Sequence, residues 1–188
     1  MARSHLETEV KLRLEGAAAA KRKLLRIGYL VQTRRTLERN TIFDTADQGL
    51  RGKSSLLRLR LAGPRRILTF KGPPREGRYK SREEIELELA DAAALVEILA
   101  GLGYRPVFRY EKYRTVYQRI GRPGLAMLDE TPIGNFLELE GSPRSIDRMA
   151  GELGYSGADY ILDSYGKLYL DHCARAGVRP RDMIFQRS

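Results

Sequence analysis

Charged residues alternate with apolar ones over residues 5–14, near the start of the chain. Glu7, Glu9, Lys11 and Arg13 fall on one face of an extended backbone, and the other face is mostly leucine and valine. This alternation predicts an amphipathic β-strand. A strand on the protein surface with one solvated face would show the same pattern, so this segment alone does not identify a site.

Four later segments repeat the spacing, and each carries charges of one sign. The like-charged pairs are Arg58 with Arg60, Glu86 with Glu88, Lys112 with Arg114, and Glu138 with Glu140. Residues two apart on a strand lie about 6.6 Å from each other on one face. At an effective dielectric constant near 20, two like charges at that distance repel by roughly 2.5 kcal/mol. Inside a closed cavity this cost recurs for each pair, and a ligand of opposite charge would relieve it.

The basic residues, with Lys11 and Lys71, suit a chain of phosphates. Arginine offers a fork of N–H donors to phosphate oxygens, and lysine offers a compact point charge. The sequence therefore predicts a polyanion, and a chain of phosphates in particular, as the ligand of these side chains.

The carboxylates require a different partner. They form an all-oxygen donor set without a thiol or imidazole, made of Glu7, Glu9, Asp129, Glu138 and Glu140. Oxygen donors suit Mg2+ or Mn2+, which would share their coordination with phosphate and water. Such an ion can stabilise charge on transferring phosphoryl oxygens, or lower the pKa of an attacking hydroxyl or water.

The elements that must position these residues follow from hydrophobic periodicity and turn residues. Strands are predicted at residues 5–14, 29–44, 55–61, 66–71, 84–89, 105–119, 125–130 and 136–141. Helices are predicted at residues 16–25, 91–102, 142–154 and 163–176. The loop at 72–78 is a candidate lid. Eight strands, mostly in antiparallel hairpins, predict an α+β protein with a closed eight-stranded antiparallel β-barrel. Its leucine faces would pack outward under helices, and its charged faces would line the lumen.

Length and composition limit the remaining questions. A chain of 188 residues with 42% hydrophobic content can bury one sizeable core. We therefore predict one domain over residues 1–176 and a basic C-terminal tail over residues 177–188. No apolar run could span a bilayer and no export signal is recognised, which predicts a soluble cytoplasmic protein without a membrane partner. The formal net charge of +10 favours an anionic partner, but nucleic acid is disfavoured because no nucleic-acid-binding signature is present.

In order along the chain, the charged motifs resemble those of one family. Glu7-x-Glu9-x-Lys11 is similar to the E-x-E-x-K signature of the CYTH superfamily, the triphosphate tunnel metalloenzymes. The other matching motifs are Arg58-Leu59-Arg60, Thr69-Phe70-Lys71-Gly72, the acidic strand 83–88, Glu111-Lys112-x-Arg114, Asp129, and Gly134-Asn135-Phe136-Leu137-Glu138-Leu139-Glu140. They follow the family's order over nearly the whole chain. The resemblance implies an eight-stranded antiparallel tunnel that binds a triphosphate with a divalent metal.

The resemblance also implies roles for single residues. The phosphate ligands would be Lys11, Arg58, Arg60, Lys71, Lys112 and Arg114. The metal ligands and their supports would be Glu7, Glu9, Asp129, Glu138 and Glu140. Hydrolytic members of the family are thought to activate water near the signature lysine and a glutamate, which makes Lys11 and Glu9 the candidates for catalysis. Which of Glu84, Glu86 and Glu88 face the site is left open.

Within the superfamily, the chain looks most like the class IV adenylyl cyclase branch, which makes cyclic AMP and pyrophosphate from ATP. This likeness rests on the form E-x-E-V-K, on residues 136–141, and on Asp163-Ser164-Tyr165 before the last helix. The alternative is a triphosphatase acting on tripolyphosphate, a nucleoside triphosphate or thiamine triphosphate. A third hypothesis is a non-catalytic polyphosphate- or nucleotide-binding module. No adenine pocket can be identified, and the preferred metal and the oligomeric state stay open, although a homodimer is compatible with the tyrosine-rich long strand.

Overall fold

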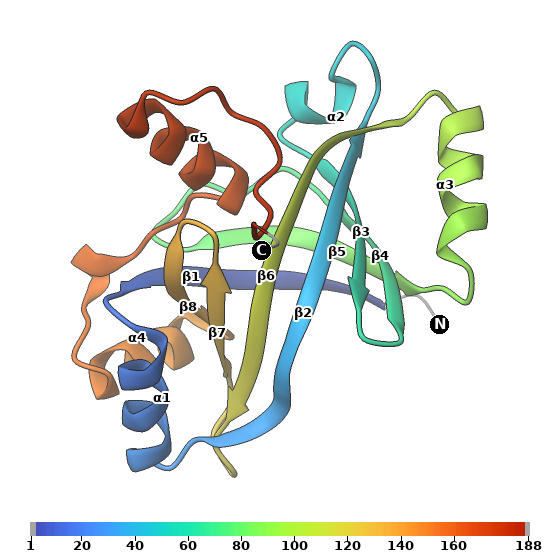
Figure 1. The fold of residues 1–188 in the computed structure, drawn as a ribbon. Coiled ribbons are helices and arrows are strands. Elements are labelled where there is room, and N and C mark those ends of the chain that lie inside the picture. Colours follow the sequence, from blue (N-terminus) through green and yellow to red (C-terminus); the bar gives the residue numbers. More distant parts are fainter. Residues whose placement is uncertain (1–2, 187–188) are drawn as a thin grey trace.

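The computed structural model describes residues 3–186, in which eight long strands curve around a central lumen (Figure 1). The strands are β1 (Arg3–Leu14), β2 (Leu30–Asp44), β3 (Leu56–Ala62), β4 (Arg65–Lys71), β5 (Lys80–Glu88), β6 (Arg105–Gln118), β7 (Leu125–Thr131) and β8 (Gly134–Glu140). Around the barrel their order is β1-β5-β4-β3-β2-β6-β7-β8, with every neighbouring pair antiparallel and β8 closing onto β1. The predicted α+β class and closed antiparallel barrel are confirmed.

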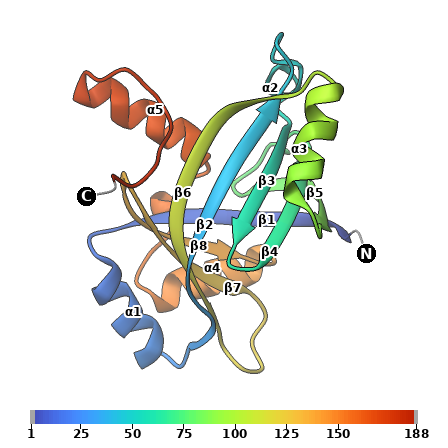
Figure 2. The ribbon, with the colours of Figure 1, turned by 45° about the vertical axis from the view of Figure 1, so that its right-hand side comes forward.

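Helices pack around the outside of the barrel (Figure 2). They are α1 (Ala17–Arg26), α2 (Gly49–Gly52), α3 (Ala92–Gly101), α4 (Pro143–Glu152), the 3-10 turn η1 (Gly157–Asp159) and α5 (Tyr165–Ala176). Side chains cap two of these helices, because Asp91 accepts hydrogen bonds from backbone N–H groups in the first turn of α3, and Ser142 accepts one at α4. Within residues 3–186, no helix is long and apolar enough to cross a membrane.

The two faces of β1 show why the barrel is polar inside. Val10 and Leu12 are fully buried in an apolar cluster with Leu24 of α1 and Ile146 of α4. Lys11, between them in sequence, points to the other side and contacts carboxylates in the lumen. The period of two therefore separates a leucine face under helices from a charged inner face. The outer cover is incomplete on β5, where Ile85 and Leu87 are 38% and 39% exposed.

Two elements differ in extent from the prediction. β5 begins at Lys80 rather than at residue 84, because residues 80–83 pair with β1. The segment after β2 contains the short helix α2, which is not among the predicted helices; the backbone N–H groups of Leu50 and Arg51 in this helix bond to the side chain of Asp44. β2 itself is continuous, but its pairing with β6 shifts register at three places. Such shifts change which side chains point inward.

The end of the chain packs against the barrel instead of leaving it. Ile161 exchanges two backbone hydrogen bonds with Lys11, of 3.0 and 2.9 Å, on the edge of β1 that β5 no longer covers. Further on, Met183 lies parallel to β6 beside Tyr110 and is 1% exposed. The segment predicted as a basic tail is thus held along β6 as far as it is described. Arg187, predicted as one of its charges, lies outside the described residues.

Candidate active site in the barrel lumen

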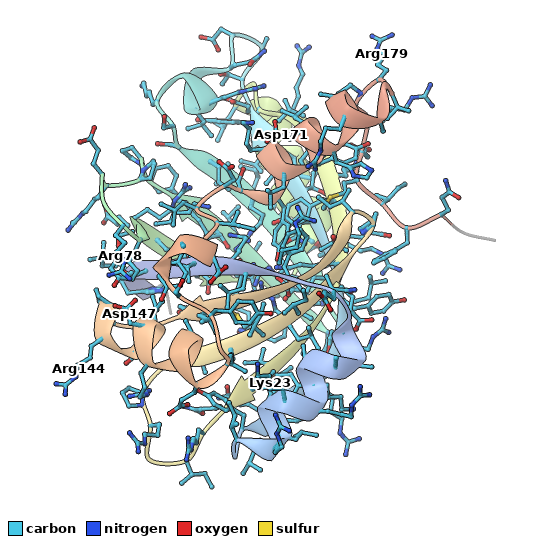
Figure 3. All side chains as sticks on the ribbon, turned by 90° about the vertical axis from the view of Figure 1, so that its left-hand side faces the viewer. Lys23, Arg78, Arg144, Asp147, Asp171 and Arg179 are labelled. Carbon is cyan, nitrogen blue, oxygen red and sulfur yellow. The ribbon has the colours of Figure 1, made fainter. Side chains whose placement is uncertain are left out.

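Charged side chains from all eight strands line the lumen. The basic ones are Lys11, Arg58, Arg60, Lys71, Lys80, Arg82, Lys112 and Arg114. The acidic ones are Glu7, Glu9, Glu38, Glu84, Glu86, Asp129, Glu138 and Glu140. All the predicted phosphate and metal ligands are among them, so the fold brings the sequence-predicted site together. Because the two sets balance, the net charge of +10 belongs to the rest of the protein, where Arg144 and Arg179 point away from the barrel (Figure 3).

Asp129 is the most enclosed acid of the lumen, with 0% exposure. It accepts hydrogen bonds from Lys112 Nζ at 2.8 Å and from Arg114 Nε and Nη2 at 2.7 and 2.6 Å. The Tyr165 hydroxyl donates a further bond of 2.6 Å. Burial alone would raise the pKa of Asp129, but Arg114 and Lys112 outweigh it and hold the pKa below its ordinary value. Asp129 is therefore an ionised anchor for two of the predicted phosphate ligands.

Lys11 lies between two carboxylates. Its Nζ is 3.0 Å from Glu9 and 3.4 Å from Glu138. Lys80 also reaches Glu9, at 3.1 Å. Burial would raise the pKa of Glu9, yet Lys11 and Lys80 hold it well below the ordinary value, so Glu9 is ionised near neutral pH. The arrangement fixes Lys11 and Glu9, the two predicted catalytic residues, in direct contact.

The opposite situation occurs at Glu140, where negative charge is not compensated. The Glu140 side chain makes no hydrogen bond or ion pair with any residue between 3 and 186. Burial, together with the charges of Glu7 and Glu9, raises its pKa to about 7. Burial and Glu9 also raise the pKa of Glu7, although Lys71 contacts that carboxylate. Repelling carboxylates of this kind attract a cation.

The carboxylates of Glu7, Glu9 and Glu140 fit a divalent ion, because they offer oxygen atoms with excess negative charge as ligands. In the part of the chain that the structure describes, no three carboxylates form a ready-made metal cluster. The reason is that the ammonium groups of Lys11, Lys71 and Lys80 already contact the carboxylates of Glu7 and Glu9. Glu7 and Glu9 would have to exchange these cations for a metal, whereas Glu140 has no such partner to give up. Asp129, also predicted as a metal ligand, already accepts from three side chains.

Several lumen residues were missed from sequence. Glu38 on β2 lies 3.5 Å from Arg60 and 3.7 Å from Lys112. Glu38 and Asn40 were not predicted to face the lumen, because the register shifts of β2 obscure which of its side chains point inward. Lys80 and Arg82 extend the alternation of β5 and could have been found by starting that strand earlier.

The structure shows which acidic residues of β5 face the lumen. Glu84 contacts Lys71 at 3.0 Å and Arg58 at 3.7 Å, and Glu86 reaches Arg58 at 3.8 Å. Glu88 instead pairs with Arg65, where both side chains are more than half exposed. Glu84 and Glu86 therefore face the site, and Glu88 lies at the rim.

The C-terminal helix places an aromatic ring against the charged residues of the lumen. Tyr165, at the start of α5, is 6% exposed and packs in an apolar cluster with Tyr110, Phe136 and Met183. Its ring centroid lies 5.3 Å from Lys11 Nζ and 4.8 Å from Lys112 Nζ, within cation–π range. This tyrosine could not be assigned to the site from sequence because it belongs to a helix rather than to a strand.

Glu140 predicts how the stability of the metal-free protein depends on pH. The pKa of Glu140 is raised from 4.5 to about 7 in the folded protein, so between these values the unfolded chain loses a proton that the folded chain keeps. The unfolding free energy should therefore fall as the pH rises through this interval, and not below it. Melting in a chelating buffer at about pH 5.5 and about pH 8 should show a smaller decline for Glu140→Gln than for the wild type. Equal declines would contradict the assignment.

Comparison with known proteins adds sequence and fold relationships. The model of the CYTH domain matches residues 5–165. A protein of Methanocaldococcus jannaschii, provisionally named an adenylate cyclase, is 27% identical over 143 residues, which cover 76% of this chain and 80% of that protein.

Solved structures share the fold at low identity. A Vibrio parahaemolyticus protein, provisionally described as an adenylate cyclase, has a TM-score of 0.74 and 20% identity, covering 88% of this chain and 98% of its own. The PH1819 protein of Pyrococcus horikoshii has a TM-score of 0.74 and 24% identity over 88% and 99% of the two chains. A Hippeastrum protein, described as a provisional adenylyl cyclase with a dominant triphosphatase activity, has a TM-score of 0.62 and 18% identity over 93% and 97%.

Proposed function

The chain belongs to the CYTH domain family, whose model matches it over residues 5–165, and on this basis we propose a metal-dependent enzyme that acts on a triphosphate in the barrel lumen. The observation that carries the proposal is the convergence of six cations on one enclosed space: Lys11, Arg58, Arg60, Lys71, Lys112 and Arg114. In the free protein, carboxylates are their partners. Phosphate oxygens can take the place of these carboxylates, since arginine and lysine donate equally well to both.

The charge balance of the lumen favours a substrate that arrives with metal. A triphosphate alone would add several negative charges to a lumen whose acids and bases already cancel. A divalent ion at Glu7, Glu9 and Glu140, with Glu138 and Asp129 as supports, would offset this charge and lower the pKa of the attacking hydroxyl or water. The family uses divalent metals generally, and we propose Mg2+ or Mn2+ here.

Lys11 and Glu9 are suited to positioning rather than to taking up a proton. Glu9 is held ionised by Lys11 and Lys80, so its carboxylate can orient a water molecule or hydroxyl by accepting a hydrogen bond. Lys11 can place its ammonium group on a phosphoryl oxygen next to that nucleophile. Arg114 and Lys112, fixed by Asp129, can hold phosphate oxygens from the other side of the lumen.

Two reactions are compatible with this arrangement of cations and proposed metal ligands. We propose first a reaction like that of class IV adenylyl cyclases, from ATP to cyclic AMP and pyrophosphate, which is consistent with the name of the M. jannaschii relative. The alternative is an inorganic or organic triphosphatase, which would use the same phosphate ligands and metal with water as the nucleophile. Hydrolysis is also what the description of the Hippeastrum protein reports for that protein.

An assay with two substrates separates these reactions. The purified protein would be incubated with Mg2+ or Mn2+ and either ATP or tripolyphosphate, and the products resolved by chromatography. Cyclic AMP and pyrophosphate in equal amounts identify the cyclase, and orthophosphate released from either substrate identifies the hydrolase. Binding without any product under either metal supports the non-catalytic module and rejects the enzyme.

A further inference from the structure

The β2 side of the lumen contains a neutral hydrogen-bond donor without an acceptor. Asn40 is 2% exposed, and its side-chain NH2 group is buried and meets no acceptor within residues 3–186. The amide oxygen of Asn40 accepts a bond of 3.3 Å from Arg60 Nε. Because a guanidinium can only donate, this bond fixes which end of the amide is oxygen. The NH2 group is therefore the end of the amide that is left without a partner.

A second donor without an acceptor lies on the same wall. Arg58 Nε is buried and has no hydrogen-bond partner among the described residues. Other guanidinium nitrogens of Arg58 donate to the hydroxyls of Thr69, at 3.1 Å, and Tyr110, at 3.5 Å. Tyr110 is also the residue opposite Asn40 in the pairing of β2 with β6. The two unused donors therefore belong to one wall, built by β2, β3 and β6.

Buried donors without an acceptor indicate the charge of the ligand that they would bind. Buried polar groups in folded proteins are almost always hydrogen-bonded, and leaving one unpaired costs free energy. An NH2 group and a guanidinium present only hydrogen atoms, so they suit an oxygen-rich anion and not a metal ion. Among the described residues, Arg82 Nε on β5 is a further buried donor without a partner, and the one buried carboxylate oxygen without a hydrogen bond, Oε2 of Glu38, lies 3.5 Å from Arg60 and 3.7 Å from Lys112.

We propose that Asn40 is a substrate-binding residue whose NH2 group donates to a phosphate oxygen at the β2–β3–β6 wall. This inference rests on the proposed function and adds a ligand to its site. Asn40 supplies a donor that adds no charge. A phosphate chain along this wall would satisfy the unused donors of both Asn40 and Arg58.

The test measures binding rather than turnover. Isothermal titration with a tripolyphosphate analogue that has bridging nitrogen atoms and resists hydrolysis, in the presence of Mg2+, would compare wild type with Asn40→Leu and Asn40→Asp. Asn40→Leu keeps the size but removes the donor, and we expect affinity to fall about tenfold or more. Asn40→Asp keeps an acceptor for Arg60 but adds negative charge, so affinity should fall further. Thr41→Val, the next residue on the outer face of β2, is the matched control and should bind as wild type does.

Two further readouts separate binding from a structural role. The melting temperature of Asn40→Leu should stay close to that of wild type, because Arg60 keeps its contact with Glu38 at 3.5 Å and the variant removes a buried donor that has no partner; a large fall in this variant would assign the residue to structure. Titration with Mn2+ alone should be unchanged in Asn40→Leu, and a weakened response would overturn a role of Asn40 toward phosphate. Normal wild-type binding with an unaffected Asn40→Leu variant overturns only the role of Asn40. Failure of the wild type to bind the analogue rejects the triphosphate proposal itself.

Discussion

Replacing Glu138 by glutamine is expected to lower turnover of the triphosphate by about 10²–10³-fold, the range seen when one charged or donor group is removed from a preorganised site. Glu138 contacts Lys11 at 3.4 Å, and Arg114 also bonds to it. The variant keeps the shape of the side chain but loses the negative charge that pairs with these two cations and that we propose supports a metal. Initial rates measured over a range of Mn2+ concentrations should recover in part as the metal concentration rises.

The control for this variant is Glu130→Gln. Glu130 lies on the outer face of the same hairpin and pairs with Arg35, whose side chain is 50% exposed. Its removal should leave the rate within error of wild type, since exposed ion pairs contribute little. If Glu138→Gln stays inactive at every metal concentration while it melts normally, Glu138 acts by positioning Lys11 and Arg114, and the metal role is excluded.

Asp129→Ala is expected to cause the largest loss of stability. The change leaves Lys112 and Arg114, both at least nine-tenths buried, without the carboxylate that pairs with them. Removing one partner of a buried ion pair costs roughly 3–5 kcal/mol. For a chain of this size, that corresponds to a fall in melting temperature of about 6–20 °C. Urea denaturation and calorimetry at neutral pH would measure both quantities.

Tyr165→Phe is the control for the Asp129 network. It keeps the carboxylate and removes only the hydroxyl that donates to Asp129, so the expected loss is about 1–2 kcal/mol. Tripolyphosphate with Mg2+ should restore part of the stability of Asp129→Ala, because phosphate oxygens would again compensate the two cations, and a ligand bound only to the folded state stabilises it. A loss no greater than that of Tyr165→Phe would show that other acids, such as Glu38, compensate the cations instead.

The charges of the lumen balance, although the net charge of the chain is +10 and predicted an anionic partner. In the structure, the strand-spaced cations of the lumen are matched by acids such as Glu38, Glu84 and Asp129. The excess of +10 therefore belongs to residues outside the lumen, and the proposed binding of phosphate depends on unused donors and exchangeable ion pairs rather than on the net charge of the lumen.

The sequence by itself determined the barrel and the direction of most site residues. A period of two is a local property, since successive side chains on any strand point to opposite faces. It therefore placed Lys11, Arg58, Lys112 and Glu138 on inner faces before any strand pairing was known. The order of charged motifs along the chain then indicated the family.

The tertiary structure decided what the periodicity could not: which charges meet. The pairing of Glu38 with Arg60 depends on the register of β2 against β3, in which Asn40 lies opposite Arg60. The contact of Tyr165 with Asp129 depends on where α5 docks. These contacts join residues far apart in sequence, and their partners are set by barrel closure and packing rather than by local spacing. For the same physical reason, the sequence could not show that the Asn40 NH2 group lacks an acceptor, because this depends on the positions of all neighbouring side chains in the fold.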